Sequence, residues 1–191
     1  MKDHDQVEMI TRVFEILEGI AFIFGIVFIS CFAWPYRMLF SNVYWRGIYT
    51  VPYLFMSPLL LMLYQIAASQ LMVVKKNYYS TICLAAGAFT NIILDVVLVK
   101  QIGIEGAAIA TLCGYLVSII ACLIVLSKLK LIQLHMRMGF VLVIMLGYLV
   151  YFRFTELATI RGVLVAVVMS IIIAFLYRKE MMVLLKKKGD Q

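Results

Sequence analysis

The sequence has little charge. Charged side chains make up 14% of its 191 residues, against about 25% in an average soluble domain. This shortage excludes a disordered chain and a soluble globular enzyme. Hydrophobic residues make up 65% and the mean hydropathy is +1.04. A globule of this size cannot bury so much apolar surface, so lipid must cover part of it, and we expect an integral membrane protein.

The sequence also lacks the signatures of catalysis and metal binding. It contains no phosphate-binding Walker loop, no His/Cys/Asp cluster with metal-ligand spacing and no nucleophile paired with a base. The two histidines, His4 and His135, are isolated, so we expect exposed or interfacial side chains. Four cysteines in apolar stretches are expected to be small buried hydrophobic residues, which excludes a secreted disulfide scaffold. We therefore predict no enzyme activity, no cofactor and no metal site.

Six apolar segments approach the roughly 20 residues that a membrane-spanning helix needs. Strands are a poor alternative because the segments are continuously apolar and about twice as long as a barrel strand. We expect Pro35 to end the first helix, and Pro52 and Pro58 to bend the second. The fold class is therefore all-α, a polytopic membrane protein with about six transmembrane helices. The expected spans are Val13–Trp34, Ile48–Val74, Tyr78–Val99, Gly106–Leu126, Met136–Phe152 and Ile160–Tyr177.

Lysine and arginine are distributed unequally between the two sides of these spans. Twelve of the 17 fall in the N-terminal segment, the second-to-third turn, the fourth-to-fifth connection and the tail. Under the positive-inside rule, both termini are expected in the cytoplasm of a protein in the inner (plasma) membrane. No cleavable signal peptide is recognised, so the first span serves as its own insertion signal. The net charge of +7 therefore indicates orientation in a lipid bilayer and not nucleic-acid binding.

Polar residues inside the spans are candidate cavity or coupling residues, because charge in a membrane is costly. Two glutamates share one face at the start of the first span. They form either a hydrated entry turn among the headgroups or a proton or cation site facing a cytoplasmic cavity. The asparagine of the third span either forms a hydrogen bond between packed helices or lines a cavity. The aspartate is either a solvated residue at the helix end or a carboxylate that lines a cavity. The candidates are Glu15, Glu18, Gln65, Gln70, Asn91 and Asp95.

Small residues gather where the third predicted helix turns into the fourth. They form a face that would let another helix approach closely, and a run of small residues, 85–88, does the same for the third helix. Because a short turn joins the two helices, we expect an antiparallel hairpin packed through these faces. The motif consists of Gly103, Gly106, Ala107, Ala110 and Gly114.

Three motifs follow one another in these helices: Gln70–Lys76, Asn91–Asp95 and Gly103–Thr111. In this order and spacing they resemble the C-terminal part of polysaccharide biosynthesis proteins. These are the O-antigen and capsule flippases of the multidrug/oligosaccharidyl-lipid/polysaccharide exporter superfamily. In that family a Gln-containing helix ends in a basic turn, an Asn-x-x-x-Asn helix follows, and a Gly-x-x-Gly-Ala-Ala-x-Ala-Thr turn comes next. Asp95 replaces the second Asn. The resemblance covers about residues 13–126.

The resemblance implies a two-lobe exporter of which this chain supplies a partial second lobe. The family has two lobes of six helices, usually with two further helices, and the predicted spans align with the ninth to fourteenth. The chain then resembles a fragment or half-size product whose partner is the missing N-terminal lobe. The implied parts are a cytoplasmic N-terminal segment (1–12), a four-helix part of the C-terminal lobe (13–126), two additional transmembrane helices (127–177) and a basic cytoplasmic tail (178–191).

The function implied by the resemblance is transport of a lipid-linked oligosaccharide, with a polyprenyl-linked glycan as substrate, by alternating access. One alternative is multidrug efflux on the same fold, driven by H⁺ or Na⁺ antiport through Glu15 and Glu18 or through Asp95. Another is a membrane scaffold that transports nothing. None of the three involves nucleic acid.

Overall fold

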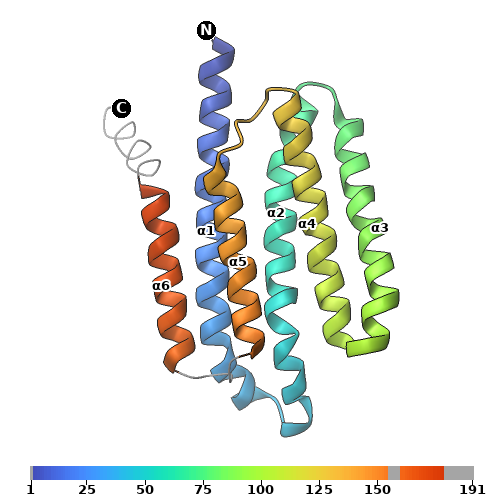
Figure 1. Ribbon diagram of the computed structural model, residues 1–191, viewed down its shortest axis with the longest axis vertical. Helices are drawn as coiled ribbons and strands as arrows, with labels where there is room; N and C mark the ends of the chain where they lie inside the picture. Colours follow the sequence, from blue (N-terminus) through green and yellow to red (C-terminus); the bar gives the residue numbers. More distant parts are fainter. Residues whose placement is uncertain (1, 155–159, 179–191) are drawn as a thin grey trace. The chain divides into compact units, whose positions relative to one another are not determined.

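The structure, a computed structural model, describes residues 2–154 and 160–178 and forms two compact units. Unit 1 combines Met1–Cys31 with Leu134–Gln191, and unit 2 is Phe32–Gln133. The described residues form helices and no strands (Figure 1), which confirms the predicted all-α fold. The elements are α1 (Lys2–Leu39), the 3₁₀ helix η1 (Asn42–Tyr49), α2 (Val51–Val73), α3 (Asn77–Ile102), α4 (Ile104–Lys128), α5 (Met136–Phe154) and α6 (Ile160–Leu176).

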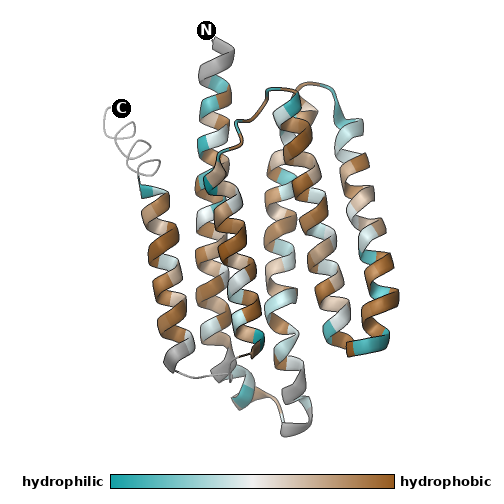
Figure 2. Cartoon of the chain, in the orientation of Figure 1, coloured by the Kyte–Doolittle hydropathy of each residue, from teal (hydrophilic) through white to brown (hydrophobic). Residues whose placement is uncertain are grey.

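Within the described residues, five helical segments are long and apolar enough to cross a membrane. They are Gln6–Phe32, Gly47–Val73, Asn77–Ile102, Ile104–Lys128 and Met136–Phe154, and a shorter apolar helix covers Gly162–Leu176. Hydrophilic residues gather mainly toward the helix ends and in the connections (Figure 2). Large apolar side chains such as Phe24, Phe89 and Val143 are exposed along the helices, as expected where lipid is the solvent. Residues 179–191, most of the predicted tail, lie outside the described residues.

The first helix is longer at both ends than the sequence predicts. Residues from Lys2 onward are already helical, and Pro35 lies inside α1 and does not end it. The expectation that Pro35 closes this helix is therefore wrong. A proline removes one backbone hydrogen bond, but the next turn is held independently: the Phe40 amide bonds the Tyr36 carbonyl at 3.0 Å, and the Tyr36 hydroxyl donates to the Tyr44 carbonyl at 2.9 Å.

Unit 2 is organised around α4, which packs against both α2 and α3. α3 lies at the outside of this unit, since only 11% of its apolar span is buried, against 39% for α4 and 50% for α2. Gly103 forms the turn between α3 and α4 with a φ of 65°, a conformation that favours glycine. Lys100 in the last turn of α3 and Glu105 in the first turn of α4 complement the helix dipoles.

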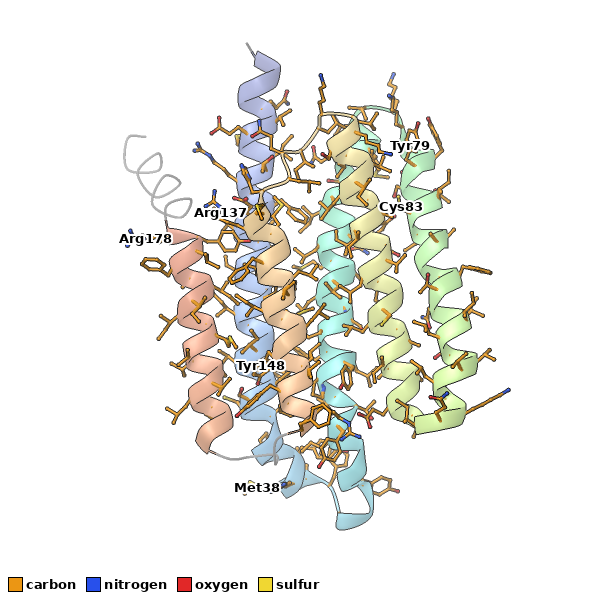
Figure 3. The ribbon with its side chains drawn as sticks, viewed as in Figure 1. Met38, Tyr79, Cys83, Arg137, Tyr148 and Arg178 are labelled. Atoms are coloured by element: carbon orange, nitrogen blue, oxygen red, sulfur yellow. The ribbon has the colours of Figure 1, made fainter. Side chains whose placement is uncertain are left out.

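Unit 1 brings α1 together with α5 and α6, which are far from it in sequence. In the C-terminal half of α1, the Ser30 hydroxyl lies 2.6 Å from the Tyr148 hydroxyl of α5, and both groups are buried. Figure 3 shows Tyr148 in this part of α5. Ile26, whose carbonyl lies near the Tyr148 hydroxyl, is fully buried, as are Met145 of α5 and Ile173 of α6. Around this hydroxyl pair the described part of unit 1 is packed by apolar side chains, as expected of helices that associate within lipid.

Candidate functional site

A polar cluster is buried near the N-terminal end of the apolar span of α1. Glu15 is 1% exposed, Glu18 is 4% exposed and Thr11 is 1% exposed. One turn earlier, Glu8 and Arg12 form an ion pair and stay partly exposed. Thr11, Glu15 and Glu18 therefore lie on the buried face of α1, whereas Glu8 and Arg12 lie on a partly exposed one. This burial favours the site alternative for Glu15 and Glu18 over the hydrated entry turn.

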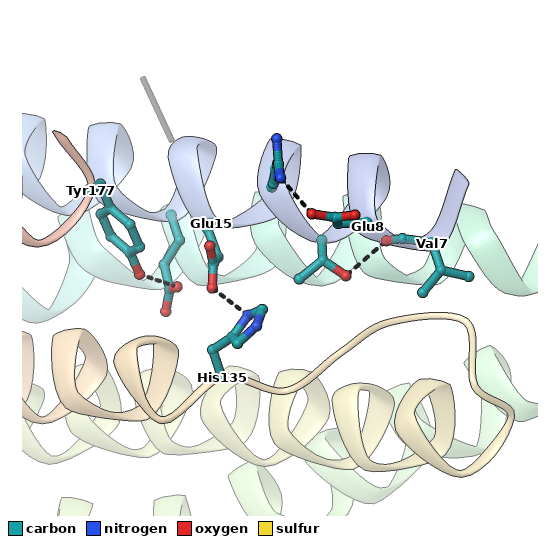
Figure 4. Close-up of polar contacts among 8 residues, drawn as sticks. Val7, Glu8, Glu15, His135 and Tyr177 are labelled. Atoms are coloured by element: carbon teal, nitrogen blue, oxygen red, sulfur yellow. Dashed lines mark hydrogen bonds and ion pairs between the residues drawn. The ribbon is translucent and has the colours of Figure 1, made fainter. Parts of the chain in front are cut away.

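Glu15 contacts His135, which lies in the connection between α4 and α5. Nδ1 of His135 is 2.8 Å from Oε1 of Glu15 (Figure 4). The His135 side chain is 40% exposed although its Nδ1 atom is buried. The imidazole therefore has one edge against a buried carboxylate and the rest of the ring toward the surface. This partial exposure agrees with the expected interfacial side chain, but His135 is not isolated in the fold, since it contacts Glu15.

Glu18 contacts Tyr177, which directly follows α6. The Tyr177 hydroxyl donates a hydrogen bond of 3.0 Å to Oε2 of Glu18, and Tyr177 is 2% exposed (Figure 4). Gly19 makes room for the ring, since a Cβ atom at this position would lie 2.5 Å from Cδ2 of Tyr177. The connection before α5 and the end of α6 thus converge on the two glutamates of α1.

The chemistry available to this cluster is proton exchange. Two buried carboxylates, one imidazole and one phenol can hold and pass protons. Among the residues that the structure describes, no group of three or more His, Cys, Asp or Glu side chains is arranged to hold a metal ion. Carboxylates buried in an apolar span are functional-site candidates by default, since their burial is costly.

Asn91 and Asp95 lie one turn apart on α3 in unit 2. Both side chains are half-buried, and the Oδ1 atom of each is buried without a hydrogen-bond partner among the described residues. Beside Asn91 is a pocket of about 200 Å³ between α3 and α4. Gly87 and Ser118 also line this pocket. The pair is thus a second polar feature, assigned to a different unit from the glutamates.

The two glutamines of α2 do not join either feature. Gln65 is exposed, whereas Gln70 is half-buried and donates a long hydrogen bond of 3.4 Å to the neighbouring Ser69 hydroxyl. The two side chains are therefore not brought together into one polar site. Both belong to unit 2.

The small residues of α3 and α4 include several points of close contact. A Cβ atom on Gly106 would lie 2.5 Å from the Leu98 carbonyl, and one on Gly114 would lie 2.9 Å from the Gly87 carbonyl. Ala110 is fully buried and Ala107 is half-buried. Gly103 lies outside this contact, with open space around the position of its Cβ, and its role is in the turn.

The partners of the two glutamates, His135 and Tyr177, were missed by the sequence reasoning. They lie 120 and 159 positions away from the glutamates that they contact. Two local signals were available: each lies at an end of an apolar segment, at the same membrane level as the start of the first span. Neither signal identifies which glutamate each residue meets.

Comparison with known protein families, with curated proteins and with solved structures gave no match for the chain.

Proposed function

We propose that the chain is part of a membrane exporter that moves a polyprenyl-linked oligosaccharide across the inner membrane. The observation that carries this proposal is the order and spacing of the three motifs, Gln70–Lys76, Asn91–Asp95 and Gly103–Thr111. They lie in α2, α3 and α4, which belong to one compact unit. The close approach of α3 and α4 at Gly106 and Gly114 supports it further, since small residues in the third motif then serve helix packing.

Two further parts of the proposal concern placement and mechanism. Both chain ends lie in the cytoplasm, as the excess of lysine and arginine on that side indicates. Transport proceeds by alternating access, in which two helical lobes rock about a central cavity. This chain contributes part of the second lobe, and the N-terminal lobe of the same exporter is its partner across that cavity.

Multidrug efflux is the second candidate, and one observation favours it. The buried pair Glu15 and Glu18 lies inside an apolar span with titratable partners, an arrangement suited to coupling transport to H⁺. The same pair is compatible with an oligosaccharide exporter, so the pair alone does not choose the substrate.

Deletion of the coding region for residues 1–191 in its own host tests the proposal. We expect lipid-linked oligosaccharides to accumulate on the cytoplasmic side of the membrane and surface polysaccharide to fall, with drug susceptibility unchanged. Both can be measured by mass spectrometry of extracted lipids and by staining of intact cells. A plasmid copy of the region should restore the wild-type state.

Two other results would overturn the proposal. Increased susceptibility to cationic drugs with normal surface polysaccharide would support efflux. Normal polysaccharide and normal drug susceptibility would support a scaffold that transports nothing.

A further inference from the structure

A shallow apolar groove runs along unit 1 between α1 and α6. Its α1 wall consists of Ile16, Ile20 and Ile23, which recur at helical spacing on one face. Its α6 wall includes Ile173 and Ala174. Ile20 is 54% exposed, so the groove opens to the surroundings of unit 1. It holds about 20 Å³, which is enough to seat the side of a narrow apolar chain and too little to enclose a ligand.

The lining of this α1–α6 groove is completed by Gly19 and Tyr177. A Cβ atom on Gly19 would lie 2.5 Å from Cδ2 of Tyr177, so the ring lies directly against the backbone of α1. The Tyr177 hydroxyl is the one polar side-chain group of the lining, and it is already bonded to Glu18. The groove therefore offers carbon surface without a free side-chain hydrogen bond. Such a surface suits a hydrocarbon chain and disfavours a sugar or a nucleotide.

A positive charge lies at the Tyr177 end of the groove. Arg178 directly follows Tyr177 and is exposed, and Figure 3 shows it directed away from the helices. Its Cζ atom lies 4.4 Å from the centroid of the Phe175 ring, a cation–π contact that holds the guanidinium beside apolar surface. Among the described residues, no carboxylate pairs with Arg178. Arg12, one turn before Ile16 on α1, is by contrast paired with Glu8.

This charge lies at the level of a bilayer where phosphate groups are found. The apolar stretch of α6 ends at Leu176, and Arg178 is only about 3 Å further along at a rise of 1.5 Å per residue. Basic side chains immediately beyond an apolar helix attract anionic headgroups. A phospholipid with a net negative charge matches both parts of the site, because its acyl chain is apolar and its headgroup phosphate is not balanced by a cation of its own.

We propose that the α1–α6 groove and Arg178 bind one anionic phospholipid of the surrounding bilayer, with an acyl chain along the groove and the headgroup phosphate on the guanidinium. The bound lipid contacts α1 and α6 together and stabilises their packing. The groove selects for a hydrocarbon chain, and Arg178 selects for negative charge. The proposal does not depend on the substrate that the exporter moves.

The test is native mass spectrometry of the purified full chain in detergent, with phosphatidylglycerol or phosphatidylcholine of the same acyl chains added. We expect phosphatidylglycerol to bind about fivefold more tightly, since one arginine near an anionic headgroup contributes about 1 kcal/mol. Arg178→Gln should reduce this preference to near unity. The matched control is Arg153→Gln, which removes an exposed arginine from the last turn of α5 in the same unit, and it should keep the preference. Ala174→Leu fills the groove and should weaken the binding of both lipids.

Four outcomes would overturn the proposal. They are equal binding of the two lipids by the wild type, an undiminished preference in Arg178→Gln, a preference lost as fully in Arg153→Gln, and unchanged binding of both lipids by Ala174→Leu. Binding of glycerol phosphate as tight as that of phosphatidylglycerol would show an anion site that does not use the groove, and it would overturn the proposal too. If Ala174→Leu does not fold, Arg178→Gln decides, because Arg178 is exposed.

Discussion

At the scale of single residues, glycine decides how closely α3 and α4 approach. A Cβ atom on Gly87 would lie 1.9 Å from the Ser118 hydroxyl and 2.3 Å from the Gly114 carbonyl. The Ser118 hydroxyl donates to this same carbonyl at 3.1 Å, so it cannot turn away without losing that bond. By contrast, Gly147 of α5 has open space around the position of its Cβ. The packing of α3 against α4 therefore requires a glycine at position 87, whereas position 147 has room for a Cβ atom.

We expect Gly87→Ala to destabilise the protein by about 1–3 kcal/mol, the usual cost of overpacking. Gly147→Ala should be neutral or stabilise by up to about 1 kcal/mol, because alanine favours the helix. Melting temperatures in detergent would compare the two variants. Equal effects would contradict the close contact between α3 and α4.

The buried hydroxyl pair of unit 1 supplies a second test at this scale. Tyr148→Phe removes the bond to Ser30, but the Ser30 hydroxyl keeps its own bond to the Ile26 carbonyl at 3.0 Å. No buried donor is therefore left without an acceptor, and the free energy of unfolding should fall by only about 1 kcal/mol. Ser30→Ala combined with Tyr148→Phe should cost less than the sum of the single changes. Strict additivity would show that the two hydroxyls do not interact.

At the scale of elements, the hairpin of α3 and α4 is the best defined part of unit 2. Ala110 is fully buried on α4, whereas its neighbour Ile109 is half-buried. Neighbouring residues on a helix point in different directions. A large side chain should therefore be tolerated very differently at these two positions.

Ala110→Leu adds bulk to a buried position and should cost about 1–3 kcal/mol. Ile109→Leu nearly conserves volume and should cost less than about 1.5 kcal/mol. The first variant should lower the melting temperature in detergent clearly, and the second should hardly change it. Small and equal shifts would mean that the small-residue face of α4 does not pack against protein.

The elements also show what the sequence could and could not predict. Continuous apolar runs predicted α2 to α6 to within a few residues, because length and hydrophobicity alone define a spanning segment. They did not predict the polar first turns of α1, which begins at Lys2 and not at Val13. The prediction that Pro35 ends the first helix is wrong, because the loss of one backbone hydrogen bond does not end a helix whose next turn is stabilised by the hydrogen bonds of Tyr36. The spacing of Glu15 and Glu18 predicted a shared face. Their partners could not be predicted, because contacts between distant helices depend on packing and not on local periodicity.

At the scale of the whole molecule, orientation in the membrane can be tested through the two ends of one helix. Lys76 directly precedes α3 and Lys100 lies in its last turn, and both are exposed. Because α3 is long enough to span the membrane, these two positions should lie on opposite sides. The charge distribution predicts that Lys100 is external.

In intact cells, Lys100→Cys should react with a membrane-impermeant thiol reagent, and Lys76→Cys should react only after the cells are opened. The unmodified chain, whose four cysteines lie in apolar helices, gives the background. The opposite labelling pattern would reverse the proposed orientation. Labelling of both positions in intact cells would contradict a spanning α3.

The joining of α1 with α5 and α6 in unit 1 has a consequence for synthesis. The ribosome completes α1 long before it makes His135 and Tyr177, so Glu15 and Glu18 enter the membrane without the partners that they contact in the finished chain. The insertion machinery must shelter these carboxylates until the last third of the chain emerges. A chain truncated after Gln133 should therefore be degraded faster than the full chain in a pulse–chase experiment, and Glu15→Gln combined with Glu18→Gln should slow that degradation.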